Sequence, residues 1–203
     1  MTQLVIATKN KKKLSEIREI LKGMDLEVFS LDLYKDVPRV VENGKTFKEN
    51  AVKKAVKSAR WTGEFCLGED SGLCVDALGG APGIYSARFS GRDKSDLKNN
   101  LKLLKLLKDL PLSKRKARYA CAVALADKNG LIGVVEGSCP GLIAFTPRGS
   151  AGFGYDPLFY IPKYKKTFAQ LGEKIKHKMS HRYHALKKAK RMIQGYIEKQ
   201  QGN

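Results

Sequence analysis

A lysine-rich segment follows the first apolar run of the chain. Residues 3–8 (QLVIAT) predict a short buried strand, and apolar residues at helical spacing predict a helix over about 11–22. A helix N-terminus carries unpaired N–H groups and a partial positive charge, so the segment at this junction is a candidate phosphate-binding loop: Thr8, Lys9, Asn10, Lys11, Lys12 and Lys13. The segment is not a P-loop, because the pattern G-x-x-x-x-G-K-[ST] is absent. The alternative interpretation is a helix cap with solvated lysines.

Two adjacent acids end a second apolar run. Glu69 and Asp70 are followed by Ser71 and Gly72. Burying two carboxylates costs free energy unless they meet a cation or hydrogen-bond donors. Mg²⁺ prefers carboxylate oxygens and commonly takes one or two of them together with substrate phosphates. The pair is therefore a candidate metal site, although D-S-G is also a common turn sequence.

Two further segments offer groups that suit a nucleobase. Residues 152–157 read G-F-G-Y-D-P, where glycines allow close backbone approach and an aromatic ring offers a stacking face. Ser180, His181 and Arg182 precede the last predicted helix, and Lys176 lies shortly upstream. Arginine suits bidentate recognition of a purine edge or a phosphate. The alternatives are a tight turn at the first segment and an N-cap at Ser180.

Alternating strands and helices must position these segments. Besides the first strand and helix, the pattern predicts strands at 26–31, 65–69, 73–78, 117–126 and 131–138, and helices at 46–60, 95–108 and 181–200. Thr46 and Glu49 form a candidate capping box, and Asn129-Gly130 a hairpin turn. The order favours an α/β or mixed α+β protein with a mixed sheet.

The bulk composition is that of a globular protein of 203 residues with an unusual charge. No apolar run approaches the length that spans a bilayer and no signal peptide is evident, so we expect a soluble, cytoplasmic protein. The cysteines are expected to be buried free thiols: Cys66, Cys74, Cys121 and Cys139. The net charge of +19 fits either a solvated lysine-rich surface or an anionic partner.

Five motifs together resemble the inosine triphosphate pyrophosphatase family, also called Ham1-like or RdgB-like. The family's T-x-N-x-x-K is matched by Thr8, Asn10 and Lys13, and its acidic strand end with S-G-L by residues 69–73. Residues 79–88 match G-G-x-P-G-x-Y-S-A-R, residues 152–157 read G-F-G-Y-D-P, and residues 180–186 match S-H-R-x-x-A-L. The motifs occur in one order along the chain, and the resemblance covers about residues 3 to 195.

The resemblance implies an architecture and an activity. The fold would be one domain over 1–203, with an elongated mixed β-sheet flanked by helices that form two lobes with a central cleft. The chain would be a homodimeric, Mg²⁺-dependent enzyme that cleaves ITP, dITP and XTP into a monophosphate and pyrophosphate. No membrane and no specific nucleic acid would be partners.

The resemblance also assigns roles to residues. Asp70 matches the carboxylate that holds Mg²⁺ and accepts a proton from water, and Glu42 matches a second acid near the metal. Thr8 to Lys13 match the triphosphate loop, and Ser71 matches a substrate contact. The base pocket would comprise Phe153, Gly154, Tyr155, Asp156, Lys176, His181 and Arg182. The sequence departs from the family beside Lys176, where Ile175 and His177 replace the usual Glu and Asn.

Three other functions compete with this interpretation. A Maf-like pyrophosphatase would prefer pyrimidine triphosphates, and the motifs at 152–157 and 180–182 argue against it. An RNA-binding module would explain the charge, but no RNP-type aromatic motif is present. A general phosphatase would release orthophosphate instead of pyrophosphate.

Overall fold

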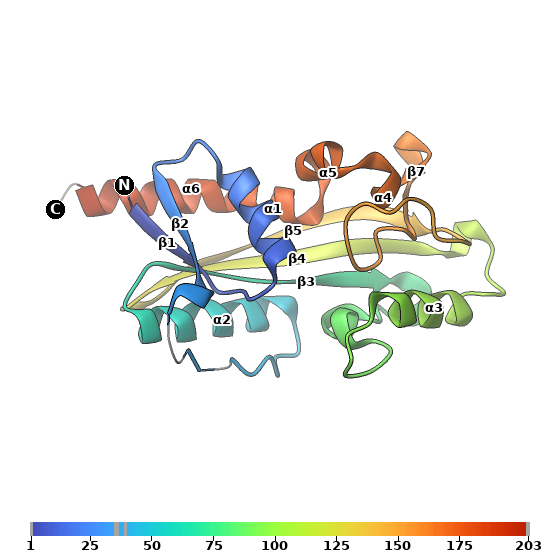
Figure 1. Cartoon of the computed structure of the whole chain (residues 1–203), viewed down its shortest axis with the longest axis horizontal. Helices are drawn as coiled ribbons and strands as arrows, with labels where there is room; N and C mark the ends of the chain where they lie inside the picture. The colour runs from blue at the N-terminus through green and yellow to red at the C-terminus, as the bar shows by residue number, and fades with distance from the viewer. Residues whose placement is uncertain (1, 35–36, 39, 202–203) are drawn as a thin grey trace. The chain divides into compact units, whose positions relative to one another are not determined.

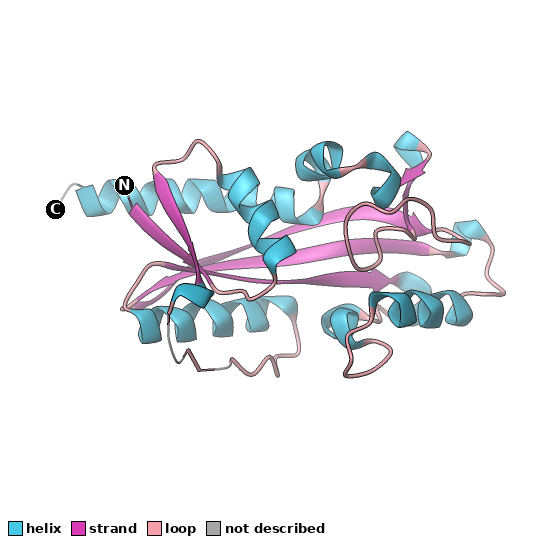
Figure 2. Cartoon of the chain, in the orientation of Figure 1, coloured by secondary structure: helices cyan, strands magenta, loops and turns pink. Residues whose placement is uncertain are grey.

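The computed structural model describes residues 2–34, 37–38 and 40–201 (Figures 1 and 2). The strands are β1 (Thr2–Ile6), β2 (Leu26–Ser30), β3 (Cys66–Val75), β4 (Lys116–Asp127), β5 (Gly130–Ile143), β6 (Phe159–Ile161) and β7 (Lys166–Thr167). The α-helices are α1 (Lys11–Leu21), α2 (Phe47–Thr62), α3 (Asp96–Leu106), α4 (Phe168–Leu171), α5 (Glu173–Met179) and α6 (His181–Gln201).

The strands form one seven-stranded sheet in the order β2-β1-β3-β4-β5-β6-β7. β1 pairs in parallel with β2, with Val5 opposite Phe29, and in parallel with β3, with Ile6 opposite Leu67. The other end of the sheet is antiparallel, because β6 pairs in that sense with both β5 and β7. The predicted mixed α/β fold is therefore confirmed.

One predicted turn is wrong. The sequence predicted two short strands, 65–69 and 73–78, around a Ser-Gly turn, but β3 runs without interruption through Ser71 and Gly72. Its residues are almost all buried, and β4 lies beside it in the sheet. Pairing and burial have overridden the local turn preference. The strand stops at Val75, where a short 3-10 helix, η2 (Asp76–Leu78), begins.

The residues group into two compact units. The first comprises 1–70, 121–137 and 182–203, and the second comprises 71–120 and 138–181. That these units make up the single domain predicted over 1–203 stays a prediction. Residues 1, 35–36, 39 and 202–203 lie outside the part of the chain that the structure describes. The chain passes between the units inside β3, β4 and β5 and at the start of α6.

The first unit buries apolar side chains on both faces of its strands. Strand side chains alternate between faces, so Leu4 and Ile6 of β1 pack in one cluster while Val5 packs in another. The first cluster contains the apolar stripes of α1 and α6, including Ile17 and Ile193. The second contains the alanines of α2 (Ala51, Ala55 and Ala59). The three helices thereby fix the strands that carry the acidic pair.

The second unit has a more aromatic core. Leu73 of β3 and Leu103 of α3 pack there with the rings of Tyr119, Tyr155, Phe159 and Phe168. The Tyr119 and Phe159 rings lie 4.6 Å apart between centroids, and those of Phe159 and Phe168 lie 4.9 Å apart. Such contacts add to the free energy gained by burial alone. This core supports the segments at 152–157 and 176–181.

Two expectations from composition can be compared with the fold. All four cysteines are free and buried, as predicted. Within the described residues, none of the helices combines the length and the apolar character that a membrane crossing needs.

Candidate functional site

The predicted phosphate loop connects β1 to α1. Asn10 is the N-cap of α1, and its Oδ1 accepts hydrogen bonds from the backbone N–H groups of Lys12 (3.0 Å) and Lys13 (3.1 Å). Thr8 Oγ1 in turn accepts from the backbone N–H of Asn10 at 3.2 Å. The polar side chains of the loop therefore cap the helix, while Lys9, Lys11 and Lys12 are exposed and leave the helix N-terminus strongly positive.

Lys13 belongs to a buried group of charges in the first unit. Its Nζ lies 2.9 Å from Glu69 Oε2, and Arg182 Nη2 lies 3.2 Å from Glu69 Oε1. The other side of the Arg182 guanidinium forms an ion pair with Glu16 on α1. The positive charges of the two cations equal the negative charges of the two carboxylates in this group. We call Lys13, Glu16, Glu69 and Arg182 the buried ion network.

Burial and charge set the protonation states around this network. Burial acts to lower the pKa of Arg182, but Glu69 and Glu16 outweigh that effect and raise it, so the guanidinium stays charged. The Cys121 thiol donates a hydrogen bond to Glu69 Oε1 at 3.3 Å. Burial and then the Glu69 charge raise the pKa of Cys121 well above its ordinary value, so this sulfur stays a thiol.

Asp70 is held by two side chains from α2. Its Oδ2 accepts a hydrogen bond from Asn50 Nδ2 at 3.1 Å, and its Oδ1 lies 3.1 Å from Lys54 Nζ. Asn50 is itself fixed, because its Oδ1 accepts from the backbone N–H of Gly44 at 2.8 Å. Burial raises the pKa of Asp70 above its ordinary value, although Lys54 and then Lys13 act to lower it. A carboxylate in this state is a stronger base than an exposed one.

Lys54 joins the two acids that were assigned to the metal. Its Nζ lies 2.9 Å from Glu42 Oε2 as well as 3.1 Å from Asp70 Oδ1, and it donates to the Glu69 carbonyl at 3.1 Å. Burial acts to lower the pKa of Lys54, but Asp70 and Glu42 raise it overall. The ammonium is therefore charged. We call Glu42, Asn50, Lys54 and Asp70 the Asp70 cluster.

Close packing of α2 on β3 places these groups. A Cβ on Gly68 would lie 2.2 Å from the Ala51 carbonyl oxygen and 2.5 Å from the Ala55 nitrogen, so only glycine fits between strand and helix. Thr46 starts the helix by accepting a hydrogen bond from Glu49 N–H at 3.1 Å. The predicted capping box is only half formed, because the Glu49 carboxylate accepts from Lys45 N–H instead of Thr46. The face with Asn50 and Lys54 thus meets the end of the acidic segment.

The Asp70 cluster suits a hard cation. Two carboxylates converge on one cationic atom, and Glu42 is partly exposed, with a side chain that is 41% accessible. That donor set matches a site in which Mg²⁺ takes one or two carboxylates and completes its shell with water and phosphate. Among the described residues, no group of three or more metal-ligating side chains is found.

A second cluster lies in the second unit around Asp156. Asp156 Oδ2 lies 2.6 Å from Lys176 Nζ and accepts from the Phe153 backbone N–H at 3.0 Å, while Oδ1 accepts from the Tyr119 hydroxyl at 3.3 Å. Burial raises the pKa of Tyr119 well above its ordinary value, so this phenol stays a donor. The His181 ring stacks on Tyr119 with centroids 4.7 Å apart. We call Tyr119, Phe153, Asp156, Lys176 and His181 the Asp156 cluster.

The loop before Asp156 is shaped by glycine. Gly152 has φ +82°, and a Cβ there would lie 2.1 Å from Asp156 Oδ2. Gly154 donates its N–H to Asp96 Oδ2 at 2.7 Å and accepts from Asn100 Nδ2 at 3.0 Å, which ties the loop to α3. Phe153 is only half-buried, whereas Tyr155 is buried and donates to the Ser86 carbonyl at 2.8 Å. Of the two rings, Phe153 is the one that a base could reach.

The structure groups the predicted residues differently from the sequence. Lys176, His181 and Phe153 to Asp156 come together, but Arg182 makes its contacts in the buried ion network. Ser71 is half-buried on β3. The prediction missed Asn50, Lys54, Glu16 and Tyr119. Asn50 and Lys54 had a signal, because two polar residues four apart interrupt the alanine face of an amphipathic helix.

Known proteins resemble this chain over nearly its whole length. The model of the Ham1 family matches residues 4–192. The chain is 51% identical over 191 residues to a dITP/XTP pyrophosphatase of Desulforamulus reducens, covering 94% of this chain and 95% of that protein. It is 48% identical over 186 residues to a dITP/XTP pyrophosphatase of Geobacter sulfurreducens, covering 92% and 94%.

Solved structures give the same result. A HAM1 protein from Coxiella burnetii superposes with a TM-score of 0.87 and 36% identity, covering 96% of this chain and all of that one. The Staphylococcus aureus Ham1 protein superposes with a TM-score of 0.86 and 37% identity over the same shares.

Proposed function

The chain belongs to the Ham1 family, and we propose on that basis that it hydrolyses non-standard purine nucleoside triphosphates, dITP, XTP and ITP, to the monophosphate and pyrophosphate. The observation that carries the proposal is the Asp70 cluster. A buried carboxylate of raised pKa is fixed by Asn50 and Lys54, in the same unit as the positive N-terminus of α1.

The residues at the start of α1 are proposed to bind the triphosphate. The N-terminus of α1 is a fixed positive charge that needs little rearrangement when anionic charge develops on the leaving pyrophosphate, and the exposed Lys9, Lys11 and Lys12 add positive charge beside it. Asn10 fixes the helix start, and Lys13 is held by Glu69. The buried ion network therefore braces the loop instead of leaving it to the substrate to order.

Asp70 is proposed to orient the attacking water and to accept its proton. Asn50 fixes Oδ2, and Lys54 fixes Oδ1, so the plane of the carboxylate is set before substrate arrives. The raised pKa of Asp70 favours proton acceptance over that by an ordinary aspartate. Glu42 provides a second carboxylate, and its partial exposure leaves access from solvent.

The reaction is proposed to use Mg²⁺ held by Asp70 and Glu42. When bound, Mg²⁺ would neutralise negative charge on the phosphate oxygens. Lys54 already shows that both carboxylates reach one cation.

The Asp156 cluster is proposed to read the base. Phe153 would offer a ring, while Lys176 and His181 would offer donors. Hypoxanthine and xanthine carry an acceptor at position 6, where adenine carries an NH₂ donor, so adenine would leave a buried donor unpaired at a cost of about 1–3 kcal/mol. We further propose that the enzyme is a cytoplasmic homodimer.

One assay tests the proposed function. Purified protein is given dITP, XTP, ITP, GTP and ATP with Mg²⁺ and with EDTA, and the products are separated. We expect pyrophosphate and monophosphate from the first three, at least about ten-fold faster than from ATP, and only with metal. Failure of folded protein to hydrolyse any of them would overturn the proposal. Orthophosphate as the product would indicate a general phosphatase, and equal turnover of ITP and ATP would refute the base-reading role.

A further inference from the structure

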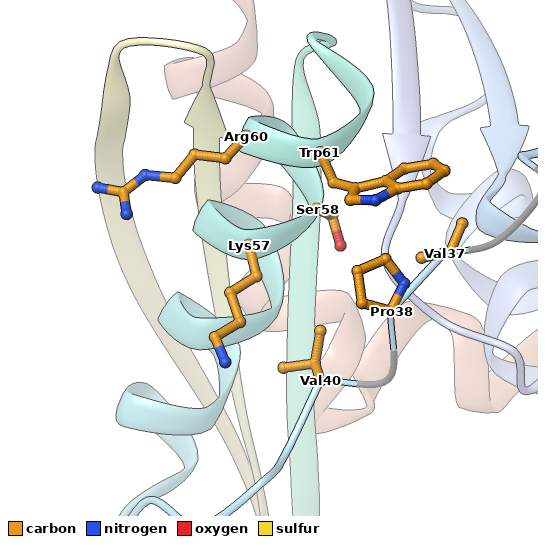
Figure 3. A pocket seen from close by; sticks show the side chains of 7 residues that line it. All are labelled: Val37, Pro38, Val40, Lys57, Ser58, Arg60 and Trp61. Atoms are coloured by element: carbon orange, nitrogen blue, oxygen red, sulfur yellow. The ribbon is translucent and has the colours of Figure 1, made fainter.

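A pocket of about 300 Å³ lies in the first unit, between residues 37, 38 and 40 and the C-terminal part of α2. Figure 3 shows Trp61 and Pro38 on one side, Val40 below them, and Ser58 and Lys57 projecting from the helix. None of these residues belongs to the Asp70 cluster, the buried ion network or the Asp156 cluster. The proposed reaction therefore leaves this pocket without a role.

A buried hydroxyl inside the pocket points to a ligand. Ser58 is 2% exposed, and its Oγ has no hydrogen-bond partner within the described part of the chain. The Ser58 carbonyl, by contrast, accepts a hydrogen bond from the Thr62 hydroxyl at 2.9 Å. In Figure 3 the Oγ is turned toward Pro38 and Val40, into the pocket. Buried polar groups are nearly always satisfied, so an unpaired hydroxyl that faces a pocket suggests a partner outside the chain.

The apolar walls of the pocket favour a ligand with a flat, apolar ring. Trp61 is 40% exposed, and Pro38 and Val40 give the pocket an apolar lining. An aromatic ring can stack on indole at little entropic cost, because both surfaces are rigid. A volume near 300 Å³ is at the lower limit of small-molecule sites, which favours one or two fused rings over a whole nucleoside triphosphate.

The charges beside the pocket select an anion. Lys57 lines the pocket from the same helix as Ser58. Its ammonium lies beside Val40 in Figure 3, and its flexible side chain lets it turn toward an oxygen that accepts from Ser58 Oγ. Arg60 contributes its stem, and its guanidinium extends away from the pocket in Figure 3. An anionic group between Ser58 and Lys57 would place an attached ring toward Trp61 and Pro38. The net charge of +19 further favours anionic ligands.

We propose that this pocket binds a small planar aromatic anion, with one or two fused rings and a carboxylate or a phosphate. The ring stacks on Trp61 beside Pro38, and the anionic oxygens bind Ser58 Oγ and Lys57 Nζ. The proposal does not depend on the nature of the enzymatic reaction.

The single tryptophan of the chain makes the test direct. In ¹⁵N-labelled full-length protein, Trp61 gives the one indole N–H signal, which is followed during titration with benzoate, benzamide, inorganic phosphate and IMP. We expect a saturable shift with benzoate, and none with benzamide or phosphate, which lack the anion and the ring respectively. Tighter binding of IMP than of benzoate would support the site with a nucleotide as its source.

Three variants locate the binding energy. Ser58→Ala is expected to weaken benzoate binding about ten-fold, as for the loss of one hydrogen bond to a charged group. Lys57→Ala is expected to weaken it about five-fold, as for a solvent-exposed charge pair. Lys48→Ala, an exposed lysine of α2 outside the pocket, is the matched control and should bind as the wild type does.

A second readout separates binding from folding. Ser58→Ala should unfold at the same temperature as the wild type or higher, because the hydroxyl that it removes has no partner in the free protein. Its turnover of dITP should also be unchanged. No saturable shift with benzoate or IMP would overturn the proposal, as would equal binding of benzamide or unaltered affinity in Ser58→Ala and Lys57→Ala.

Discussion

The ammonium of Lys54 lies 3.1 Å from Asp70 Oδ1 and also reaches Glu42. One buried ammonium therefore contacts both carboxylates that we propose for the metal and neutralises only one of their two charges. A divalent cation that binds these carboxylates must share them with Lys54 or shift it. We therefore expect metal affinity, stability and catalysis to be coupled through Lys54, a residue that the proposed chemistry does not consume.

Asp70→Asn tests the proposed base. The amide keeps the shape of the side chain but cannot accept a proton, so turnover of dITP should fall by about 10²–10⁴-fold. Pyrophosphate release under saturating Mg²⁺ measures it. Asp76→Asn, an aspartate paired with Arg118 in an exposed position, is the control and should keep its activity. Near-wild-type turnover by Asp70→Asn would exclude Asp70 as the base.

Lys54→Met tests the coupling at the Asp70 cluster. It leaves Asp70 and Glu42 without their shared cation, so the free energy of unfolding should fall by about 3–5 kcal/mol. Added Mg²⁺ should raise the melting temperature of this variant more than that of the wild type, because a cation is now missing. Lys53→Met, whose ammonium binds Asn43 in an exposed position, should show neither effect. An equal response to Mg²⁺ in both proteins would place the metal elsewhere.

Arg182→Leu tests the buried ion network. The change leaves Glu16 and Glu69 buried without the guanidinium, and we expect a loss of about 3–5 kcal/mol in chemical denaturation. In a Glu16→Gln background the same substitution should cost at least about 1 kcal/mol less, since one stranded charge is gone. Arg191→Leu, on an exposed position of α6, should cost within about 0.5 kcal/mol. Equal costs at 182 and 191 would refute the network's role.

Substitution of Gly152 and of Gly154, which lie in one loop, distinguishes the cost of backbone strain from the cost of a steric clash. Both have positive φ, but a Cβ would meet Asp156 only at Gly152. Gly154→Ala should therefore cost about 1–2 kcal/mol from its backbone conformation alone. Gly152→Ala should cost a further ~1–3 kcal/mol and reduce kcat/KM for dITP more, because the carboxylate that binds Lys176 must move. Thermal unfolding and kinetics of the two variants decide the comparison; the reverse order would contradict it.

Two buried thiols predict a loss of stability in alkali. Burial raises the pKa of Cys66 and of Cys139 from 9.0 to about 11. Their contribution is fully present below pH 9 and is lost as the pH rises to 11, because the unfolded chain gives up these protons first. Between pH 8 and pH 10 each thiol should account for about 1.3 kcal/mol of the decline.

Urea denaturation at the two pH values measures this decline. The Cys66→Ala and Cys139→Ala variants should each show a shallower decline than the wild type by that amount. Identical slopes in all three proteins would show that these pKa values are not raised by folding.

Much of the fold was accessible from the sequence because its signals are local. Helical spacing located α1 and α2 to within two residues, and the Asn129-Gly130 pair located the turn between β4 and β5. Short strands and helices such as β6, β7, α4 and α5 were missed, since two to seven residues carry too little periodicity. The false turn at Ser71-Gly72 arose because strand pairing, which is not local, decides that segment.

The candidate site was only partly accessible for a related reason. The motifs predicted Asp70 and Lys176 as site residues, but the side chains that contact such residues depend on the packing of segments that are distant in the sequence. Arg182 meets Glu16 across 166 positions of the sequence, and no local pattern specifies that pair. Lys54 was detectable as a lysine on an apolar helix face, yet its partners Glu42 and Asp70 follow only from the packing of α2 against Gly68.

The interleaving of the two units constrains how the chain is made. The core that contains Leu4 and Ile17 also needs Ile193 of α6, so it stays incomplete until α6 has been synthesised. The second unit is likewise built from two separated segments. A nascent chain thus exposes unfinished apolar surface until α6 is available, as expected of a topology rich in long-range contacts. No cut in the sequence yields either unit as one contiguous fragment, so deletion of α6 should abolish folding.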